Sequence, residues 1–180
     1  MLFKNKYRIE SSRLKGYDYS SPGKYFITIV TKFRTRFFGH VENGKMILNE
    51  TGKIANNFWL QIPDHFNHVN LDEHIVMPDH IHGIIELTPN VVETPNCVQT
   101  TNYKESSNLG VSTAEKKRHP IGIIINQFKR ICTIEIRKYN AEFAWQPRFH
   151  DKIIRNEQSL KNIRQYIINN PKNWKQNKFK

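Results

Sequence analysis

The chain has 180 residues and a mass of 21.4 kDa, which is enough for one domain with a substantial core. Hydrophobic residues make up 38% and charged residues 24% of the sequence, so the composition excludes both a disordered chain and a membrane protein. We expect a soluble, cytoplasmic protein without a membrane partner, because no apolar run could span a bilayer and the N-terminus lacks the apolar core of a signal peptide. Cys97 and Cys132 lie far apart, which argues against a disulfide framework and a thiolate zinc site.

The strong positive charge indicates a polyanionic partner. The chain carries 28 Lys and Arg against 16 Asp and Glu, a net charge of +12, and nucleic acid is the most frequent partner of such a protein. Nine basic and two acidic residues give +7 over residues 1–40, three and nine give −6 over 41–114, and sixteen and five give +11 over 115–180. If both basic ends pack on one side of the domain, they form a phosphate-binding surface around something in the acidic middle.

After a basic leader over residues 1–23, the sequence predicts a strand, a hairpin and a helix. Residues 24–31 are rich in aromatic and β-branched side chains, which predicts the first strand. Asn43-Gly44 lies between two short runs and is typical of a type I′ hairpin. From residue 50 to residue 61 apolar side chains recur every four positions, which predicts an amphipathic helix that Pro63 ends.

Two apolar-rich runs, residues 69–77 and 81–87, follow on either side of Pro78-Asp79 and predict adjacent strands. Residues 88–119 are dominated by polar and charged side chains with little periodicity, which predicts a polar loop insert and not a second domain.

The last third of the chain predicts helix, strand and helix. Pro120 begins a helix that runs to about Tyr139, because Pro is favoured at the first helical position and apolar residues follow at a spacing of three or four. Residues 145–155 contain the last strand, and Asn156 is the N-cap of a final helix that ends before Pro171. The order indicates an α+β fold in one domain over residues 1–180: a ferredoxin-like (RRM-like) βαββαβ antiparallel sheet, helices on one face, with an extra C-terminal helix.

His80-Ile81-His82 is the first candidate site. On a strand, side chains alternate between the two faces, so both imidazoles lie on one face and Ile81 on the other. Two imidazoles in this arrangement can bind one divalent metal, although two surface or hydrogen-bonded histidines would give the same pattern. The predicted strand is the third of four and should be central in the sheet. A pair of polar side chains is unexpected on such a strand unless it has a specific role.

Tyr166 and Asn170 are the second candidate pair. They lie four residues apart on the final helix and therefore one above the other on one face. Leu160, Ile163 and Ile167 form the apolar stripe of this helix and place Tyr166 at its edge. A tyrosine packed at the margin of the core is the alternative interpretation.

Together these features resemble the single-tyrosine HUH transposases, in particular the REP-associated tyrosine transposases and IS200-like transposases of bacteria. The motifs that carry the resemblance are LKGYDYSSPGKYFITIVT, VMPDHIHGIIEL, NQFKR and WQPRFHDKIIRNEQSLKNIRQYIINNP, and they cover nearly the whole chain. The sequence departs from the family in having Asp79 where relatives usually have Asn, in the long insert, and in having Asn170 where some relatives have Gln.

The resemblance implies a metal-dependent reaction on DNA. His80 and His82 would bind Mg²⁺ or Mn²⁺ with Asn170 as the third protein ligand, and Tyr166 would be the nucleophile. Attack on a phosphodiester would give a 5′-phosphotyrosine link to single-stranded DNA beside a hairpin of the REP type, followed by rejoining. Relatives act as monomers or dimers, so the resemblance leaves a homodimer open.

Basic and aromatic residues would hold the DNA. Lys and Arg side chains can contact the backbone and aromatic rings can stack on unpaired bases, and the leader is the expected recognition segment in such proteins. The candidate DNA-contacting residues are Lys15, Tyr17, Tyr19, Lys129, Arg130, Arg148, Lys152, Arg155 and Arg164.

Two other functions fit the same charge and fold. A non-catalytic RRM-like nucleic-acid-binding domain would need neither the histidine pair nor the tyrosine. A replication initiator or relaxase-type nickase would use the same catalytic groups, but the chain is short and has no helicase-like region.

Overall fold

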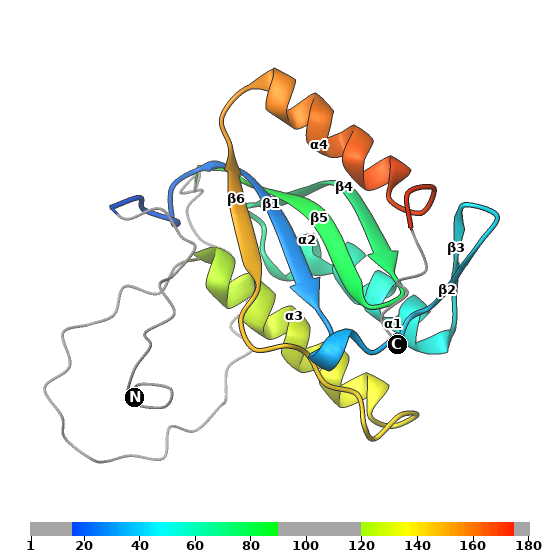
Figure 1. The fold of residues 1–180 in the computed structure, drawn as a ribbon. Helices are drawn as coiled ribbons and strands as arrows, with labels where there is room; N and C mark the ends of the chain where they lie inside the picture. The colour runs from blue at the N-terminus through cyan, green and yellow to red at the C-terminus, as the bar shows by residue number, and fades with distance from the viewer. Residues whose placement is uncertain (1–15, 90–119, 175–180) are drawn as a thin grey trace, which may run out of the picture.

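A computed structural model describes residues 16–89 and 120–174 of the chain. Lys15 and nearly all of the predicted insert lie outside the described residues. The described residues contain a four-stranded antiparallel sheet in the order β4-β5-β1-β6 and a separate two-stranded hairpin, β2-β3 (Figure 1). The strands are β1 (Gly23–Val30), β2 (Gly39–Glu42), β3 (Lys45–Leu48), β4 (Val69–Met77), β5 (His80–Leu87) and β6 (His150–Ile154).

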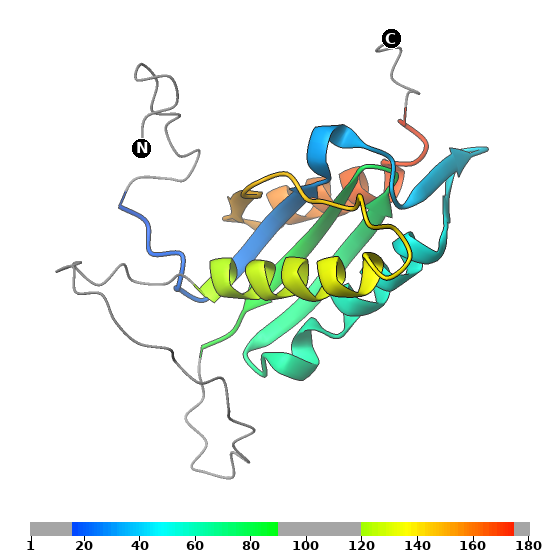
Figure 2. The same ribbon diagram turned by 90° about the horizontal axis from the view of Figure 1, so that it is seen from below.

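The helices lie on both faces of the sheet. They are η1 (Lys32–Arg34), α1 (Glu50–Leu60), α2 (Ile62–His65), α3 (Pro120–Ile136) and α4 (Glu157–Asn169). α1 and α3 pack against each other on one face, and α4 lies across the other, where it contacts β4 and β6 (Figures 1 and 2). The ferredoxin-like topology is confirmed, with the first and third strands of the motif, β1 and β5, in the centre.

Two hydrophobic clusters follow from this layering. The larger lies between the sheet and α1 and α3 and contains fully buried side chains such as Tyr25, Ile81 and Trp59. The smaller lies beneath α4 and is built from Ile84, Ile154, Leu160 and Ile167. Because these last two residues come from the predicted stripe of α4, that stripe is what attaches the helix to the sheet.

Several predicted boundaries are close to those observed. Asn43 and Gly44 have φ values of 48° and 70°, as a type I′ turn requires. The side chain of Asn156 accepts a hydrogen bond from the Ser159 amide at 2.8 Å, which confirms the N-cap of α4. Pro63 lies in the first turn of the short helix α2, whereas α1 has already ended at Leu60.

Two other features complete the described structure. The helix that begins at Pro120 ends at Ile136 and is followed by a turn, so it is shorter than the periodicity predicts. Among the residues described, we find no helix with the length and apolar character needed to cross a membrane.

Gly83 sets the distance between β5 and α1. A Cβ atom at this position would lie 2.2 Å from a ring carbon of Trp59, whose side chain is fully buried. The indole therefore occupies the space that a side chain on the central strand would need. A glycine at this point lets the largest core residue lie directly on the sheet.

We predict that Gly83→Ala destabilises the fold by about 1–3 kcal/mol, because the added methyl group overpacks the Trp59 ring. Gly122→Ala on α3 is the matched control, since nothing lies within 4 Å of its added Cβ. Its free energy of unfolding should be unchanged or raised by up to about 1 kcal/mol. Urea denaturation of both variants tests this, and equal stability of Gly83→Ala and wild type would contradict the packing argument.

Candidate active site

The alternation of β5 brings both histidines of the motif beneath α4. Ile81 belongs to the core on the α1 and α3 side, whereas Ile84 belongs to the cluster under α4, so His80 and His82 face α4. Their ring centroids are 4.5 Å apart, and the residues are only 7% and 6% exposed. The prediction that the pair shares one face of a central strand is confirmed.

His82 is held from three sides. Its Nδ1 lies 2.8 Å from the Thr28 hydroxyl on β1, the residue directly opposite in the strand register. Phe26 stacks on the imidazole at 5.2 Å between centroids. Nε2 lies 3.3 Å from the hydroxyl oxygen of Tyr166. When Nδ1–H donates to Thr28, Nε2 carries the lone pair and can accept from the tyrosine.

The imidazole of His82 is uncharged at neutral pH. Burial, followed by the neighbouring His80, lowers the pKa of His82 to about 3. A neutral imidazole is the form that binds a metal ion or accepts a proton. The environment of His82 therefore favours the state that either role needs.

His80 is oriented by the residue that precedes it. Its Nδ1–H donates to the Asp79 carboxylate, which leaves Nε2 with the lone pair. The other Asp79 oxygen lies 3.6 Å from a guanidinium nitrogen of Arg34, and the carboxylate is almost fully buried. A carboxylate behind an imidazole fixes the tautomer and increases the basicity of the free nitrogen.

Tyr166 lies at the exposed edge of α4 and above the histidines. It is 50% exposed, and its ring meets those of His82 and Phe26 edge-on at 5.2 and 6.0 Å between centroids. Asn170 follows one turn later as the C-cap of α4 and is 9% exposed. Tyr166 is thus half exposed to solvent while its hydroxyl contacts His82.

The histidines supply two imidazole nitrogens that face α4, and Asn170 lies one helical turn beyond the tyrosine. In the described part of the chain no group of three or more His, Cys, Asp or Glu side chains is arranged so that it could hold a metal ion by itself. Two nitrogens and one neutral oxygen suit a divalent ion that keeps positions for water or phosphate oxygens. The residues present fit Mg²⁺ or Mn²⁺ in such an open site.

A bidentate ion pair attaches α4 to the edge of the sheet. Nε and a terminal nitrogen of Arg164 donate to the two carboxylate oxygens of Asp72 on β4 at 2.8 and 2.6 Å. The hydrogen bonds from Arg164 lower the pKa of Asp72. Arg164, a predicted DNA contact, therefore has a protein partner two residues before Tyr166.

The other predicted DNA-contacting residues are distributed over several surfaces. Lys129 donates to the carbonyl oxygens of Gln146 and Arg148 at 2.8 and 2.9 Å, and burial lowers the pKa of its amine. Arg130 is exposed on the same helix, α3, which covers the opposite face of the sheet from Tyr166. Tyr19 is only 4% exposed and packs edge-on against Tyr17 at 5.2 Å.

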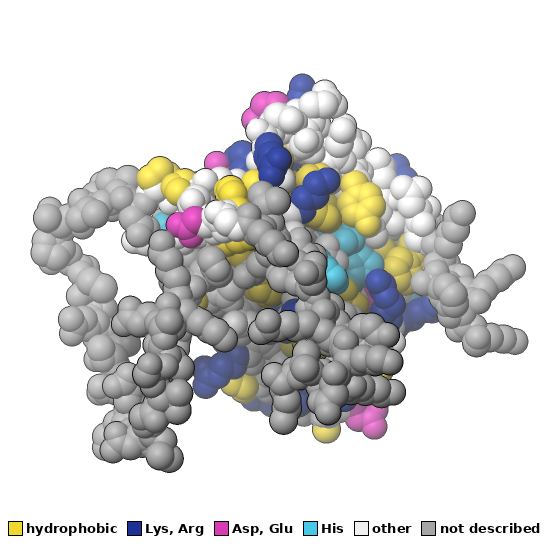
Figure 3. Space-filling model, turned by 60° about the vertical axis from the view of Figure 1, so that its left-hand side comes forward, with side chains coloured by type: hydrophobic (Ala, Val, Ile, Leu, Met, Phe, Trp, Pro, Cys, Tyr) yellow, Lys and Arg dark blue, Asp and Glu magenta, His cyan; other side chains and the backbone are white. Residues whose placement is uncertain are grey.

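Lys152 and Arg155 lie at an open cleft beside β6, the free edge of the sheet. The cleft has a volume of about 340 Å³ and is lined by Tyr19, Asp151, Lys152, Ile153, Arg155, Asn156 and Ser159. Figure 3 shows histidine side chains at the surface, with Lys and Arg side chains on two sides of them. Because Asn156 and Ser159 belong to its lining, the cleft adjoins the first turn of α4. Its two basic residues belong to the predicted DNA-contacting set.

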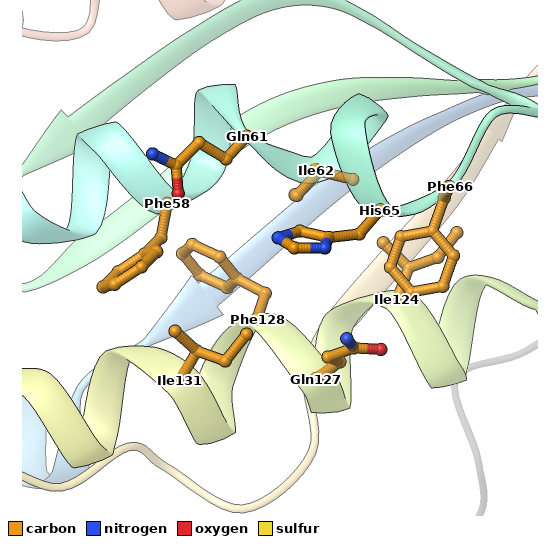
Figure 4. Close-up of a pocket in the computed structure, with 9 residues that line it drawn as sticks. All are labelled: Phe58, Gln61, Ile62, His65, Phe66, Ile124, Gln127, Phe128 and Ile131. Carbon is orange, nitrogen blue, oxygen red and sulfur yellow. The ribbon is translucent and has the colours of Figure 1, made fainter. Parts of the chain in front are cut away.

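A second hollow, on the opposite face, has a different character. Side chains of α1, α2 and α3, including Phe58, Phe66 and Phe128, point toward one another around it (Figure 4). Its volume of about 20 Å³ is near the smallest that holds one water molecule. It is a packing defect between helices, and its lining is mostly apolar, with Gln61, His65 and Gln127 as the polar side chains.

Sequence reasoning missed Thr28, Phe26 and Arg34 as parts of the site. Thr28 and Phe26 lie in the first predicted strand, and only the register between β1 and β5 shows which of its residues face the histidines. Arg34 lies in the turn after that strand. Alternation alone could have placed Phe26 and Thr28 on one face, but not on the face of the histidines.

Comparison with known proteins gives one close relative in sequence and a likeness in fold. No protein-family model matches the chain. An uncharacterized protein of Haemophilus influenzae is 38% identical over 170 residues, which cover 94% of this chain and 91% of that protein. A solved REP-associated tyrosine transposase bound to a REP hairpin has the same fold, with a TM-score of 0.57 at 18% identity, covering 89% of this chain and 73% of that one.

We predict that Asp72→Asn destabilises the protein at neutral pH, because Arg164 loses a charged partner. The lowered pKa means that the native state binds the Asp72 proton less tightly than the unfolded state does. The ion pair therefore stabilises the fold above about pH 5, and this contribution is lost as pH falls through the lowered pKa. Urea denaturation from pH 7 to pH 2 should show the variant and wild type converging in acid.

Glu50→Gln is the control for this experiment, because Glu50 pairs with Lys53 on the exposed surface of α1. Such surface pairs contribute little, so we expect almost no change. A deficit of Asp72→Asn that persists unchanged at pH 2 would contradict the role of the ion pair.

Proposed function

We propose that this chain, which belongs to the same protein family as the Haemophilus influenzae relative, is a transposase-like strand transferase that cuts and rejoins single-stranded DNA. The observation that carries the proposal is the contact between Tyr166 and His82. The two residues are 84 positions apart in the sequence, and the tyrosine oxygen lies 3.3 Å from Nε2 of the imidazole. A half-exposed phenol beside two oriented imidazoles, of which His82 is neutral, is suited to nucleophilic attack on a phosphodiester.

The reaction consists of an exchange of one phosphate ester for another. The Tyr166 oxygen forms a bond to phosphorus, and the bond between phosphorus and the 3′-oxygen of the preceding nucleotide breaks. The phenol loses its proton and the departing 3′-oxygen gains one, which leaves a 5′-phosphotyrosine and a free 3′-hydroxyl. Attack by a 3′-hydroxyl on the same phosphorus reverses the exchange, so the strand can be rejoined without ATP.

His80, His82 and Asn170 are the proposed ligands of Mg²⁺ or Mn²⁺. Such an ion, when bound, polarises the phosphate and reduces its negative charge. Thr28 and Asp79 contact Nδ1 of the two imidazoles, so that Nε2 of His82 faces Tyr166, and Phe26 stacks on the His82 ring. The protein therefore positions the ligand nitrogens before any ion arrives.

The proposed substrate is single-stranded DNA next to a hairpin. The solved transposase with the same fold is bound to a REP hairpin, and a hairpin leaves an unpaired strand at its base. Lys152 and Arg155 at the cleft beside β6 would hold the phosphates of that strand. From Ser159, which lines the cleft, to Tyr166 is seven residues of helix, or about 10 Å.

A non-catalytic RRM-like domain is disfavoured by the position of α4. RRM domains bind RNA by stacking bases on an open face of the sheet. Here α4 covers that face and buries Ile84 and Ile154 against Leu160 and Ile167. The sheet is not available as a stacking platform, whereas the tyrosine on α4 is exposed.

We predict that wild-type protein, incubated with hairpin oligonucleotides and Mn²⁺, forms an adduct with DNA that survives denaturation. Tyr166→Phe should form none, because the nucleophilic oxygen is removed. Tyr139→Phe is the control, since Tyr139 is 74% exposed and follows α3, and it should match wild type. An equal amount of adduct from Tyr166→Phe would show that another residue is the nucleophile.

We also predict that the double variant His80→Ala, His82→Ala binds Mn²⁺ at least about 10–100-fold more weakly than wild type, the loss known for weakened ligand sets. Isothermal titration calorimetry measures the affinity without a DNA substrate. His65→Ala is the control, because His65 is exposed and lies on α2, on the opposite face of the sheet from His80 and His82. Unchanged affinity in the double variant would refute the ligand assignment.

A further inference from the structure

The turn after β1 carries an aromatic side chain in an unusual position. Residues 32–36, Lys-Phe-Arg-Thr-Arg, are all exposed, and we call them the KFRTR loop. The Phe33 side chain is 87% exposed, more than any other large hydrophobic side chain in the described residues. The Lys32 amine lies over the ring, 5.1 Å from its centroid. An exposed phenylalanine contributes nothing to the core.

The backbone of the loop is strained at this point. Phe33 and Arg34 have φ values of 56° and 54°, in the left-handed region that non-glycine residues avoid. A bulky side chain in this region is rare, and such strain occurs most often at binding and active sites. The conformation aims the Phe33 ring outward, where a turn of glycine or asparagine would have been unstrained.

The surrounding structure holds this conformation in place. The buried Thr31 hydroxyl donates to the carbonyl oxygens of Thr35 at 2.7 Å and Asp79 at 2.9 Å. The amide of Lys32 donates to the Ala144 carbonyl at 2.8 Å. Both ends of the loop are therefore fixed, one of them to the residue that orients His80.

The loop is also positively charged and next to the proposed active site. Lys32, Arg34 and Arg36 are basic, and residues 31–41 contain no acid. Arg34 lies 3.6 Å from the Asp79 carboxylate, which in turn accepts a hydrogen bond from His80. A continuous series of direct contacts thus joins the loop to the histidine pair.

We propose that the KFRTR loop is a binding subsite for single-stranded DNA, in which Phe33 stacks on an unpaired base and Lys32 and Arg36 contact the adjoining phosphates. An aromatic ring and cations in alternation are what single-strand binding requires, because every base presents a flat face between charged phosphates. That the loop lies next to the reacting phosphate rests on the proposed function. That Phe33 stacks on an unpaired base does not depend on strand cleavage.

The position of the loop extends the proposed DNA path. The loop follows the end of β1, and the cleft with Lys152 and Arg155 lies beside the start of β1, because Lys24 pairs with Ile154 on β6. Thr28 and His82 lie between the two. The strand would therefore run along β1, past Tyr166, with the KFRTR loop at one end and the cleft at the other.

The first experiment places a fluorescent reporter in the loop. Phe33→Trp should show strong quenching of the added tryptophan emission when a poly-dT oligonucleotide is bound, because a stacked base quenches indole fluorescence. Leu60→Trp is the matched control, since Leu60 is 52% exposed at the end of α1, on the face of the sheet opposite α4. Wild-type protein, with its three tryptophans, supplies the background to subtract.

The second experiment measures affinity by fluorescence anisotropy with labelled poly-dT. Phe33→Ala should weaken binding by about 5- to 100-fold, as loss of one base–aromatic stack does. Phe33→Tyr should restore it. Arg36→Gln should weaken binding and reduce the slope of log affinity against log salt concentration by about 0.7, as expected for one lost phosphate contact. Phe33→Ala should leave that slope unchanged.

The outcomes separate this inference from the proposed function. Quenching in Phe33→Trp without an adduct from wild type would support the subsite and overturn strand cleavage. An adduct from wild type, with equal binding by Phe33→Ala and no quenching in Phe33→Trp, would overturn the subsite alone. Failure of wild type to bind single-stranded DNA would overturn both.

Discussion

Burial of β5 on both faces is the constraint on which the rest of this structure depends. One face must pack against α1 and α3, and Gly83 there admits the Trp59 ring directly onto the strand. The other face would expose Ile84 unless α4 covered it. Two histidines on this second face are therefore desolvated, and each must find a partner for Nδ1, which Thr28 and the Asp79 carboxylate provide. The burial that makes the pair costly also orients it and keeps His82 neutral.

The position of Tyr166 is a consequence of how α4 is attached. Leu160 and Ile167 anchor one side of the helix, and the Arg164–Asp72 ion pair ties it to the far edge of the sheet. With these contacts fixed, the helical period leaves Tyr166 at the margin, half exposed, with its hydroxyl over His82. The proposed nucleophile needs access to solvent and contact with the buried pair at once, and the edge of the apolar stripe offers both. The alternative interpretation of Tyr166, a tyrosine packed at the margin of the core, accounts for its position but not for its contact with His82.

Local patterns predicted the elements and their order because each depends on residues close in the sequence. Alternation around Ile81, the Asn43-Gly44 turn and the Asn156 cap all report local geometry, and the structure has them as expected. What could not be predicted depends on tertiary contacts. The sequence does not show which face α4 covers, that Thr28 lies opposite His82, or that Arg164 forms an ion pair with Asp72. Of the predicted insert, residues 88–119, the structure describes only Thr88 and Pro89, which follow β5.

The net charge of the chain has to be reinterpreted once the contacts of each basic side chain within the protein are known. Net charge predicts a polyanion but treats every Lys and Arg alike. Lys129 is occupied by backbone carbonyl groups and Arg164 by a carboxylate, so neither is a simple solvated cation. Among the exposed charges, Lys152 and Arg155 lie beside the first half of β1 and the KFRTR loop follows its other end, and the eight residues of β1 span about 26 Å. Because the Tyr166–His82 contact lies between them, a strand held at both ends would be stretched across the nucleophile. Such tension would hold one phosphate in place without contacts to the neighbouring bases. The proposed strand exchange needs this property, because a second strand must take the place of the first at the same point.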